Sequence, residues 1–498
     1  MKNATVRLDF KSVGHRIGPL VGRAGKPGMA GERGGAHKVF HRSSFLRTFV
    51  FMKKLTLLCI ALVAAALPLG AQRAGETPEQ KTARMAWFDS AKLGIFIHWG
   101  IYAVDGVSES WSFYNKYLPY EQYMAQKAGF TAADYDPAAW ADLIQESGAK
   151  YTVITSKHHD GIALWDTQAS DLSVPKQTPA GRDVLTPFVK EARKRGLKVG
   201  LYYSLLDWSH PDYPNFTKDE TRYAIADDPA RWQRFVDFDK AQLTELSQAY
   251  RPDLFWFDGD WEQSAETWHA PEIIGLLTSY NKEVIVNSRI QGYGDYGTPE
   301  QGVPTIRPED RYWELCYTIN DSWGFQHTDL NFKTPQMILK TFVDCLSMGG
   351  NLLLDIGPRA DGTIPEEQIA VLKELGRWTK KHKEAIYGTR AGIPAGFAPG
   401  YTTLNQAGDI LYVYLPYRPN GAVEIKGIMN QVQRIWVVGS GSMLNYKVYN
   451  KVYWNDIPGL LEIDVPEQAL DPGITVLAIL LDGPVRLYKG AGQVITAN

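Results

Sequence analysis

Polar side chains collect directly after the apolar runs of this sequence, and the densest group is His158, His159 and Asp160. Imidazoles and carboxylates at such positions can bind a metal ion, relay a proton or hydrogen-bond the hydroxyls of a sugar. Four other apolar runs end in the same way, with His98 and Trp99, with Tyr202, Tyr203 and Asp207, with Trp256, Asp258 and Asp260, and with Asn287 and Arg289. One polar run end carries little information, whereas five of them indicate one shared site.

The carboxylates define the chemistry of this site more closely than the histidines do. Asp258 ends the very apolar run Leu254–Phe257, so its carboxylate is partly removed from water, and Arg289 could keep it ionised. An ionised, positioned aspartate can be a covalent nucleophile in glycosyl transfer if a second carboxyl group of raised pKa lies roughly 5 Å away. Glu300, in the loop "YGTPEQG", is our first choice for this acid because a loop can reach a site from its rim. Glu314, in "YWELC", is the second choice, and we interpret it as a buried structural carboxylate.

Other chemistries have weaker support in the sequence. His158 and His159 are expected to point to opposite sides of a strand, so both cannot easily face one metal ion, and the His-x-x-x-His spacing is missing. Two histidines from separate strands with Asp258 remain the metal alternative. Asp260 should face away from Asp258 or lie in the following loop. The chain has no serine nucleophile elbow, P-loop or dinucleotide fingerprint, so we expect neither a metal nor a cofactor.

The elements that must position these residues alternate between strand and helix from about residue 87 to 388. Apolar runs of this kind, buried on both faces, are typical of parallel sheets. They are Leu93–Gly100, Tyr151–Asp160, Lys198–Trp208, Asp253–Trp261, Glu283–Arg289 and Asn351–Pro358. Three helices are expected among the segments that follow them: a helix whose N-terminus is capped by Asp136, a helix at Val184–Lys198 and a helix at Glu366–His382. The alternation predicts an irregular (β/α)8-like, TIM-type barrel over residues 78–390, with its active site at the C-terminal ends of the strands. A doubly wound sheet is the alternative, although "IHWGIYAV" is not the phosphate loop it would need.

The composition changes after Gly388. Short alternating strands separated by Gly, Asn and Pro turns, with no helical pattern, predict an antiparallel β-sandwich at residues 395–495.

The N-terminal region is expected to lie outside the fold. Residues 52–71 have two lysines, a long apolar stretch and then small residues, which is the plan of a signal peptide and predicts a secreted or periplasmic protein. A membrane span is the alternative, but the apolar run is shorter than the roughly 20 residues that a span needs. Residues 1–51 are interpreted as an artefact of the assigned start or as a disordered leader. The formal net charge of −2 gives no reason to expect nucleic acid as a partner, and no membrane is expected once the signal is removed.

The cysteines indicate neither a disulfide scaffold nor a zinc site. Cys59, Cys316 and Cys345 are too few for a disulfide scaffold and do not have zinc spacing. Cys316 and Cys345 are expected to be buried free thiols.

Five motifs, "FIHWG", "KHHDG", "GLYYSLLDW", "LFWFDGDW" and "LSMGGNLLLDIGPRADGTIP", resemble in order those of the α-L-fucosidases of glycoside hydrolase family 29. The resemblance covers about 300 residues and implies a catalytic (β/α) barrel, a C-terminal β-sandwich and a retaining, metal-free double displacement on fucosylated oligosaccharides or glycoconjugates. It implies that Asp258 is the nucleophile. The position of Glu300 matches the general acid in some branches of the family, and the position of Glu314 matches it in others.

The resemblance also implies which residues bind the sugar. His98, His158 and His159 would hydrogen-bond fucose hydroxyls, Arg289 would lie near the nucleophile, and Trp256 belongs to the nucleophile motif. The family's Glu-Trp pair is matched by Glu109 and Trp111 with one residue between them. Of Tyr202 and Tyr203, strand alternation allows only one to face the pocket fully. The alternatives to this function are another exo-glycosidase, such as an α-galactosidase, and a non-catalytic secreted carbohydrate-binding protein.

Overall fold

The computed structural model describes residues 73, 75–454 and 456–490. The predicted signal peptide at 52–71, the extension at 1–51, Cys59 and the last residues of the predicted sandwich lie outside this part of the chain. Of the helices in the described part, none combines the length and apolar composition that a bilayer crossing requires.

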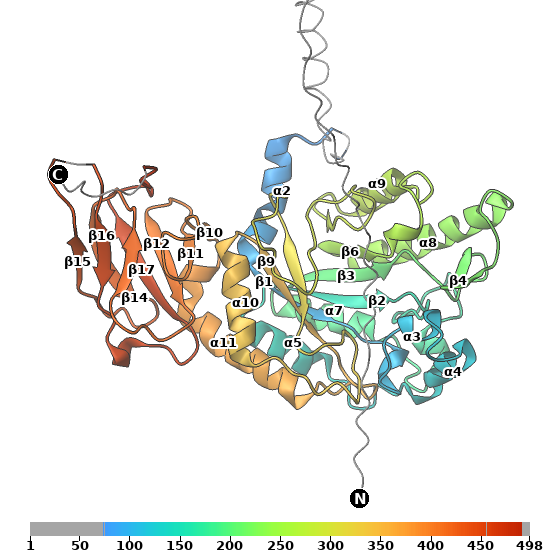
Figure 1. Cartoon of the computed structure of the whole chain (residues 1–498). Helices are drawn as coiled ribbons and strands as arrows, with labels where there is room; N and C mark the ends of the chain where they lie inside the picture. Colours follow the sequence, from blue (N-terminus) through green and yellow to red (C-terminus); the bar gives the residue numbers. More distant parts are fainter. Residues whose placement is uncertain (1–72, 74, 455, 491–498) are drawn as a thin grey trace, which may run out of the picture. The chain divides into compact units, whose positions relative to one another are not determined.

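Seven parallel strands form the sheet that positions the site (Figure 1). They are β1 (Leu93–Ile97), β2 (Tyr151–Lys157), β3 (Lys198–Ser204), β6 (Leu254–Asp258), β7 (Ile285–Val286), β8 (Glu314–Thr318) and β9 (Asn351–Ile356). Their order in the sheet is β7-β6-β3-β2-β1-β9-β8. Almost every residue in them is buried, as the continuous apolar runs predict.

Residues 296–300 close the gap between the two edge strands, β7 and β8. Parallel bridges join Asn287 to Tyr296 on one side, and Gly297 to Trp313 and Glu300 to Cys316 on the other. The order around the closed sheet therefore follows the order in the sequence. This is the irregular barrel that the sequence predicts, and it rules out the doubly wound alternative.

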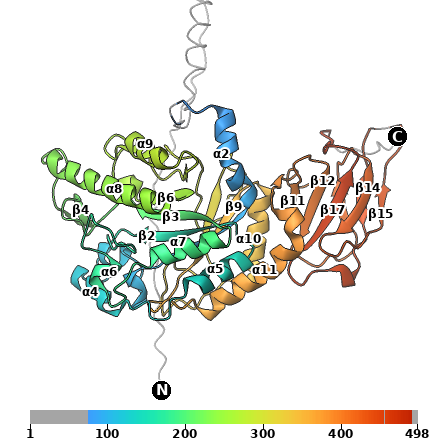
Figure 2. The ribbon, with the colours of Figure 1, turned by 180° about the vertical axis from the view of Figure 1, so that it is seen from behind.

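Helices lie around the barrel strands in both views (Figures 1 and 2). They are α2 (Pro78–Ala91), α3 (Trp111–Tyr114), α4 (Tyr120–Ala125), α5 (Pro137–Glu146), α6 (Val174–Gln177), α7 (Leu185–Lys194), α8 (Pro229–Tyr250), α9 (Ala270–Tyr280), α10 (Pro335–Ser347) and α11 (Glu366–Ile386). Short 3₁₀ turns are η1 (Ile101–Ala103), η2 (Gln126–Gly129), η3 (Asp260–Glu262) and η4 (Glu467–Ala469), and β4 (Asn215–Thr217) pairs with β5 (Glu220–Thr221). The predicted cap is confirmed, because Asp136 Oδ1 accepts hydrogen bonds from the backbone of Ala138 and Ala139.

Two antiparallel sheets follow the last helix. One has the order β10-β11-β12-β17-β14 and the other β13-β16-β15, with a separate apolar core of their own. Their strands are β10 (Arg390–Ala391), β11 (Tyr401–Leu404), β12 (Ile410–Leu415), β13 (Val423–Lys426), β14 (Val432–Val437), β15 (Tyr446–Tyr449), β16 (Leu460–Ile463) and β17 (Thr475–Leu481). This confirms the predicted sandwich. Cys316 and Cys345 are both buried free thiols, as expected.

Candidate active site

A small pocket of about 140 Å³ lies at the C-terminal ends of the barrel strands. Its lining contains three carboxyl groups, two histidines and one arginine together with aromatic rings. It consists of Phe96, His98, Glu109, Trp111, His158, Tyr202, Trp256, Asp258, Trp261, Arg289, Glu300 and Trp323. Three larger hollows, of about 500, 430 and 400 Å³, are lined wholly or mainly by residues of the β-sandwich. None of these three contains a histidine among its described lining residues, so the chemistry favours the smaller pocket in the barrel.

Arg289 joins the two candidate catalytic carboxylates. Its Nη1 donates to Asp258 Oδ1 at 2.9 Å, and its Nη2 donates to Glu300 Oε2 at 2.6 Å. Burial alone would lower the pKa of Arg289, but the negative charges around it, of Asp258 and Glu300 among others, hold that pKa above its ordinary value. Both carboxylates are therefore hydrogen-bonded to the same guanidinium group.

Asp258 is the last residue of β6 and receives contacts from three sides. Besides Arg289, the Tyr202 hydroxyl donates to Oδ2 at 3.0 Å, and His159 Nε2 lies 3.6 Å from the same oxygen. The side chain is 13% exposed, so one edge of the carboxylate remains open to a ligand. Asp260, two residues on, instead accepts a hydrogen bond from the Gln291 backbone at 2.6 Å and is not part of the pocket wall.

Glu300 is positioned by the closing segment of the barrel and is not on a free loop. The backbone of Cys316 donates to Pro299 at 3.1 Å, and the backbone of Gln301 donates to Cys316 at 3.0 Å. The Glu300 side chain is 41% exposed at the rim of the pocket. This placement suits a group that meets a departing oxygen.

Glu314, the second choice for the acid, lies elsewhere. It begins β8, is fully buried, and accepts hydrogen bonds from the Tyr151 hydroxyl and from Trp256 Nε1. Burial raises the pKa of Glu314 to about 7. It does not line the pocket, and the interpretation as a structural carboxylate fits this geometry.

The pocket histidines are held through their Nδ1 atoms. His98 Nδ1 lies 2.7 Å from Asp355 Oδ1, and His158 Nδ1 lies 2.6 Å from Ser110 Oγ. Burial lowers the pKa of His98 and raises that of Asp355, so the pair is held without net charge. With one proton between Nδ1 and the carboxyl oxygen, His98 Nε2 carries a hydrogen that it can donate to a ligand.

His159 is not among the residues that line the pocket, so its expected contact with the sugar stays a prediction. It is fully buried, its Nδ1 lies 2.5 Å from Ser204 Oγ, and its Nε2 lies near Asp258 without a hydrogen-bond partner. The expectation that His158 and His159 point to opposite sides is wrong, because their ring centroids are 4.3 Å apart. Strand β2 ends at Lys157, so alternation no longer applies to them.

Tyr203, which was considered together with Tyr202, does not line the pocket. Its hydroxyl donates to Asp239 Oδ1 at 2.7 Å, on the side of the strand that faces α8, whereas Tyr202 faces the pocket. Strand alternation is the physical reason, since successive side chains of β3 point to opposite faces.

Glu109 and Trp111 both line the pocket although one residue separates them. Glu109 has a φ of 28°, in the left-handed region, and its Oε1 accepts a hydrogen bond from the Gly324 backbone at 2.6 Å. Burial raises the pKa of Glu109 to about 7. Trp256 also lines the pocket, with the Arg289 guanidinium 4.5 Å from its ring centre.

Several site residues were not predicted from the sequence. Trp261 at the rim stacks on Trp111 with ring centroids 6.0 Å apart, and Trp323 lies 5.0 Å from the His98 ring. Trp261 could have been found from its place three residues after Asp258, and Asp355 from being the one charged residue in the run "NLLLDI". Phe96 and Trp323 give no such signal.

Comparison with known proteins agrees with this geometry. A family model described as alpha-L-fucosidase matches residues 62–384. The chain belongs to the alpha-L-fucosidase family of glycoside hydrolases. The curated alpha-L-fucosidase of Dictyostelium discoideum is 33% identical over 395 residues, which are 71% of this chain and 83% of that protein. The tissue alpha-L-fucosidase of Rattus norvegicus is 33% identical over 335 residues, 61% of this chain and 70% of the relative.

Solved structures of family members share the fold. Alpha-L-fucosidase isoenzyme 1 from Paenibacillus thiaminolyticus is 32% identical, with a TM-score of 0.73 over 81% of this chain and 99% of that one. A Bacteroides thetaiotaomicron family 29 alpha-L-fucosidase, trapped as a covalent intermediate with 2-fluoro-fucosyl fluoride in a glutamate-to-glutamine variant, is 28% identical, with a TM-score of 0.71 over 80% of this chain and 96% of that one.

Proposed function

We propose that the protein is an exo-acting, retaining α-L-fucosidase that removes terminal α-L-fucose from glycans by double displacement. The observation that carries this proposal is the pair Asp258 and Glu300 on the two terminal nitrogens of Arg289, in a pocket small enough to admit one sugar. The intermediate trapped in the Bacteroides thetaiotaomicron relative supports the covalent route. The separation of the two carboxyl groups distinguishes the mechanisms in general, since it is about 5 Å in retaining enzymes and about 6.5–9.5 Å in inverting ones, which need room for a water.

The two steps use the carboxylates in turn. Asp258 attacks the anomeric carbon while Glu300 gives its proton to the departing glycosidic oxygen, leaving a fucosyl ester on Asp258. Glu300, now ionised and facing Arg289, takes a proton from water as that water attacks the same carbon. Asp258 then departs as a carboxylate, and fucose is released with its original anomeric configuration. Such acid–base assistance contributes about 10²–10⁴-fold.

The other pocket residues recognise the sugar in this proposal. His98 Nε2, His158 and the Glu109 carboxyl group are placed to hydrogen-bond its hydroxyls. Phe96 and Trp323 offer an apolar wall for the methyl group that distinguishes fucose from a hexose with a C6 hydroxyl. Trp111 and Trp261 lie at the rim, where the rest of the glycan would extend.

The first experiment tests the nucleophile. We expect Asp258→Asn to lower kcat on an aryl α-L-fucoside by at least about 10³-fold, since no carboxylate then remains to form the ester. Asp260→Asn is the matched control, because that carboxylate contacts the Gln291 backbone and should leave kcat within about threefold. A panel of aryl glycosides, α-galactoside included, tests the sugar specificity. Near wild-type turnover by Asp258→Asn would refute the proposal.

The second experiment separates the two glutamates. Glu300→Ala should regain turnover with added azide, which occupies the vacated space and attacks the ester, giving fucosyl azide of retained configuration. Glu314→Ala should show no azide rescue because its carboxylate is enclosed by Tyr151 and Trp256. The reverse result would exchange the two roles.

We also propose that the chain is exported through a signal peptide at residues 52–71. The sequence pattern supports this proposal, and N-terminal sequencing of the mature protein tests it. A mature protein that begins at Met1 or Met52 would contradict it.

A further inference from the structure

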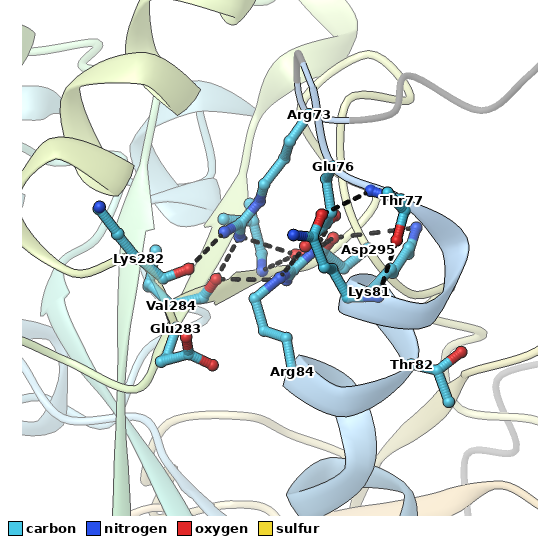
Figure 3. Close-up of polar contacts among 12 residues, drawn as sticks. Arg73, Glu76, Thr77, Lys81, Thr82, Arg84, Lys282, Glu283, Val284 and Asp295 are labelled. Carbon is cyan, nitrogen blue, oxygen red and sulfur yellow. Dashed lines mark hydrogen bonds and ion pairs between the residues drawn. The ribbon is translucent and has the colours of Figure 1, made fainter.

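A buried cluster of charges joins helix α2 to Asp295 (Figure 3) and shares no residue with the pocket lining. Arg84, on helix α2, donates from Nη1 and Nη2 to the two oxygens of Asp295, each at 2.8 Å. Arg73 Nη2 adds a contact to Asp295 Oδ2 at 3.2 Å. The Arg84 side chain is 3% exposed and that of Asp295 is 7% exposed. Bidentate contacts of this kind fix orientation as well as distance.

Glu76 completes the cluster on the helix side. Arg84 Nε donates to Glu76 Oε1 at 2.6 Å, and Arg84 Nη2 donates to Glu76 Oε2 at 2.7 Å. Burial alone would raise the pKa of Asp295, but the hydrogen bonds and charge of Arg84, with the charges of Arg73 and Lys81, keep that pKa below its ordinary value. Asp295 is therefore an ionised carboxylate held rigidly by α2.

Asp295 also attaches the start of the segment that closes the barrel to strand β7. Its Oδ2 accepts a hydrogen bond from the Val286 backbone at 3.0 Å, and its own backbone donates to Val286 at 2.6 Å. Tyr296 follows, buried against Phe88 of α2 with ring centroids 4.5 Å apart. The same segment then runs past Thr298, which accepts from Arg289 Nε at 3.1 Å, and ends at Glu300.

Residues 296–300 are joined by backbone hydrogen bonds to the strands on both sides. On the β7 side Ser288 donates to Tyr296 at 2.8 Å, and on the β8 side Gly297 donates to Tyr312 at 3.1 Å and Glu314 donates to Gly297 at 3.0 Å. Five extended residues span about 16 Å. Asp295 and its partners hold one end of this stretch, and the backbone hydrogen bonds of Pro299 and Gln301 to Cys316 hold the end that carries Glu300.

We propose that Asp295, clamped by Arg84 and Arg73, is a positioning residue that holds Glu300 in register with Asp258. This inference rests on the acid–base role proposed for Glu300. Releasing the clamp lets the segment move relative to β6, which carries Asp258. A displacement of about 1 Å at a catalytic group can cost about 10²-fold in rate.

The test compares substrates that differ in their need for acid catalysis. An aryl α-L-fucoside with an activated leaving group, 2-chloro-4-nitrophenyl, departs with little help, whereas the phenyl fucoside requires protonation. For Asp295→Asn we expect kcat/KM on the phenyl substrate to fall at least about tenfold more than on the activated one. Asp295→Asn keeps the size of the side chain and one acceptor for the Val286 backbone but removes the charge.

Asp471→Asn is the matched control. Asp471 is also a buried carboxylate with two basic partners, Arg377 Nη2 at 2.9 Å and Lys381 Nζ at 2.7 Å, but it belongs to the β-sandwich side of α11. We expect this variant to lose thermal stability and to change both substrates by the same factor. A general loss of folded enzyme also lowers the activity on both substrates equally. The ratio of the two kcat/KM values therefore reports only on acid catalysis by Glu300.

The quantity to compare is kcat/KM on the activated substrate divided by kcat/KM on the phenyl substrate. The proposed role of Asp295 is supported if this ratio changes in Asp295→Asn and not in Asp471→Asn. It is overturned if the ratio is the same in both variants. If Asp295→Asn gives no folded protein, Arg73→Met replaces it with the same two outcomes; this change removes the contact to Asp295 together with the hydrogen bonds to the Lys282 and Val284 backbone, and leaves the two contacts of Arg84 to Asp295 in place. Failure of azide rescue in Glu300→Ala would instead reject the role of Glu300, whatever the ratio in the clamp variants.

Discussion

Adjacent residues in this site differ in whether they line the pocket. Strand alternation explains the difference between Tyr202 and Tyr203, but not that between His158 and His159, which follow the end of β2. Tyr202 contacts the proposed nucleophile, while Tyr203 contacts Asp239 and Gln242 on the helical side of the sheet. His158 lines the pocket, while His159 is buried behind Asp258. Side-chain direction is thus as informative as residue type at the end of a parallel strand.

The two tyrosines make a matched pair of substitutions. Tyr202→Phe removes the hydroxyl that donates to Asp258, and a hydrogen bond to a charged group is worth about 1.5–3 kcal/mol. We therefore expect kcat/KM on an aryl fucoside to fall about tenfold or more. Tyr203→Phe removes hydrogen bonds outside the pocket, so it should lower the melting temperature and leave kcat/KM within about threefold. Equal losses of activity in both variants would show that the pocket assignment is wrong.

Glu314 makes the stability of the protein depend on pH. Burial raises its pKa from 4.5 to about 7, so the folded state binds this proton more tightly than the unfolded chain does. The stabilisation is fully present below about pH 4.5 and is lost as pH rises to about 7, by up to about 3 kcal/mol. Glu314→Gln lacks the titrating group, and its free energy of unfolding in urea should fall less between pH 5 and 7.5 than that of the wild type. Parallel curves for the two proteins would refute this origin.

The sequence was informative about residues at the ends of long apolar strands. Asp258, His98, His158 and Arg289 all reach the pocket from such positions. Trp323 could not be predicted, because it lies on a connection between β8 and α10 whose path depends on tertiary packing. Its contact with His98 joins segments more than 200 residues apart in the sequence.

At the scale of elements, the least predictable part is the stretch between β7 and β8. Residues 296–300 contain Gly, Thr and Pro and no apolar run, so nothing in them resembles a buried strand. They nevertheless complete the barrel through isolated bridges and place Glu300. The preference for Glu300 over Glu314 agrees with the geometry, and Glu300 does lie at the rim, but it is bridged to Cys316 of β8 where the sequence suggested a loop.

Gly294 shows how closely this stretch approaches its neighbour. A Cβ added there would lie 1.9 Å from the backbone oxygen of Asn287. We expect Gly294→Ala to lower the free energy of unfolding by about 1–3 kcal/mol, because the two segments must move apart. Chemical denaturation measures this change.

Gly275→Ala is the control for that substitution. Gly275 lies within helix α9, and an added Cβ there would meet nothing within 4 Å. Alanine should stabilise the helix by roughly 0.5–1 kcal/mol. A destabilisation of Gly275→Ala equal to that of Gly294→Ala would argue against the steric explanation.

At the scale of the whole molecule, the barrel and the sandwich share buried surface. Tyr412, Tyr414 and Val476, from the sandwich strands, belong to the same apolar cluster as the barrel core. Trp378 of α11 is fully buried and donates from Nε1 to the Ile474 backbone at 2.8 Å. The sequence predicted both folds but not this shared core, because periodicity shows which face is apolar and not what covers it.

A chain that ends at Gly388 should therefore fail to give a soluble barrel. Without the sandwich strands, Trp378 and its neighbours on α11 would be exposed to solvent as an apolar patch, and such a patch promotes aggregation. The soluble fraction after expression and the near-ultraviolet circular dichroism measure this outcome. Trp378→Phe in the full chain loses only the indole donor, so it should stay soluble with a modest loss of about 1 kcal/mol. A soluble, active truncated chain would show that the sandwich is dispensable.

The guanidinium of Arg289, shared by Asp258 and Glu300, also helps to set the net charge at the mouth of the pocket, and therefore the electrostatic potential that acts on an approaching glycan. With Glu300 ionised, two carboxylates against one cation leave an excess negative charge at a mouth whose histidines are held uncharged by burial, whereas with Glu300 protonated, as the first step of the mechanism requires, the charges of Asp258 and Arg289 cancel. We therefore expect acidic glycans, with a sulfate or a uronic acid next to the terminal fucose, to be repelled more than neutral ones by the enzyme whose Glu300 is ionised. Added salt screens that repulsion, so the enzyme discriminates between decorated and plain glycans most strongly in dilute buffer.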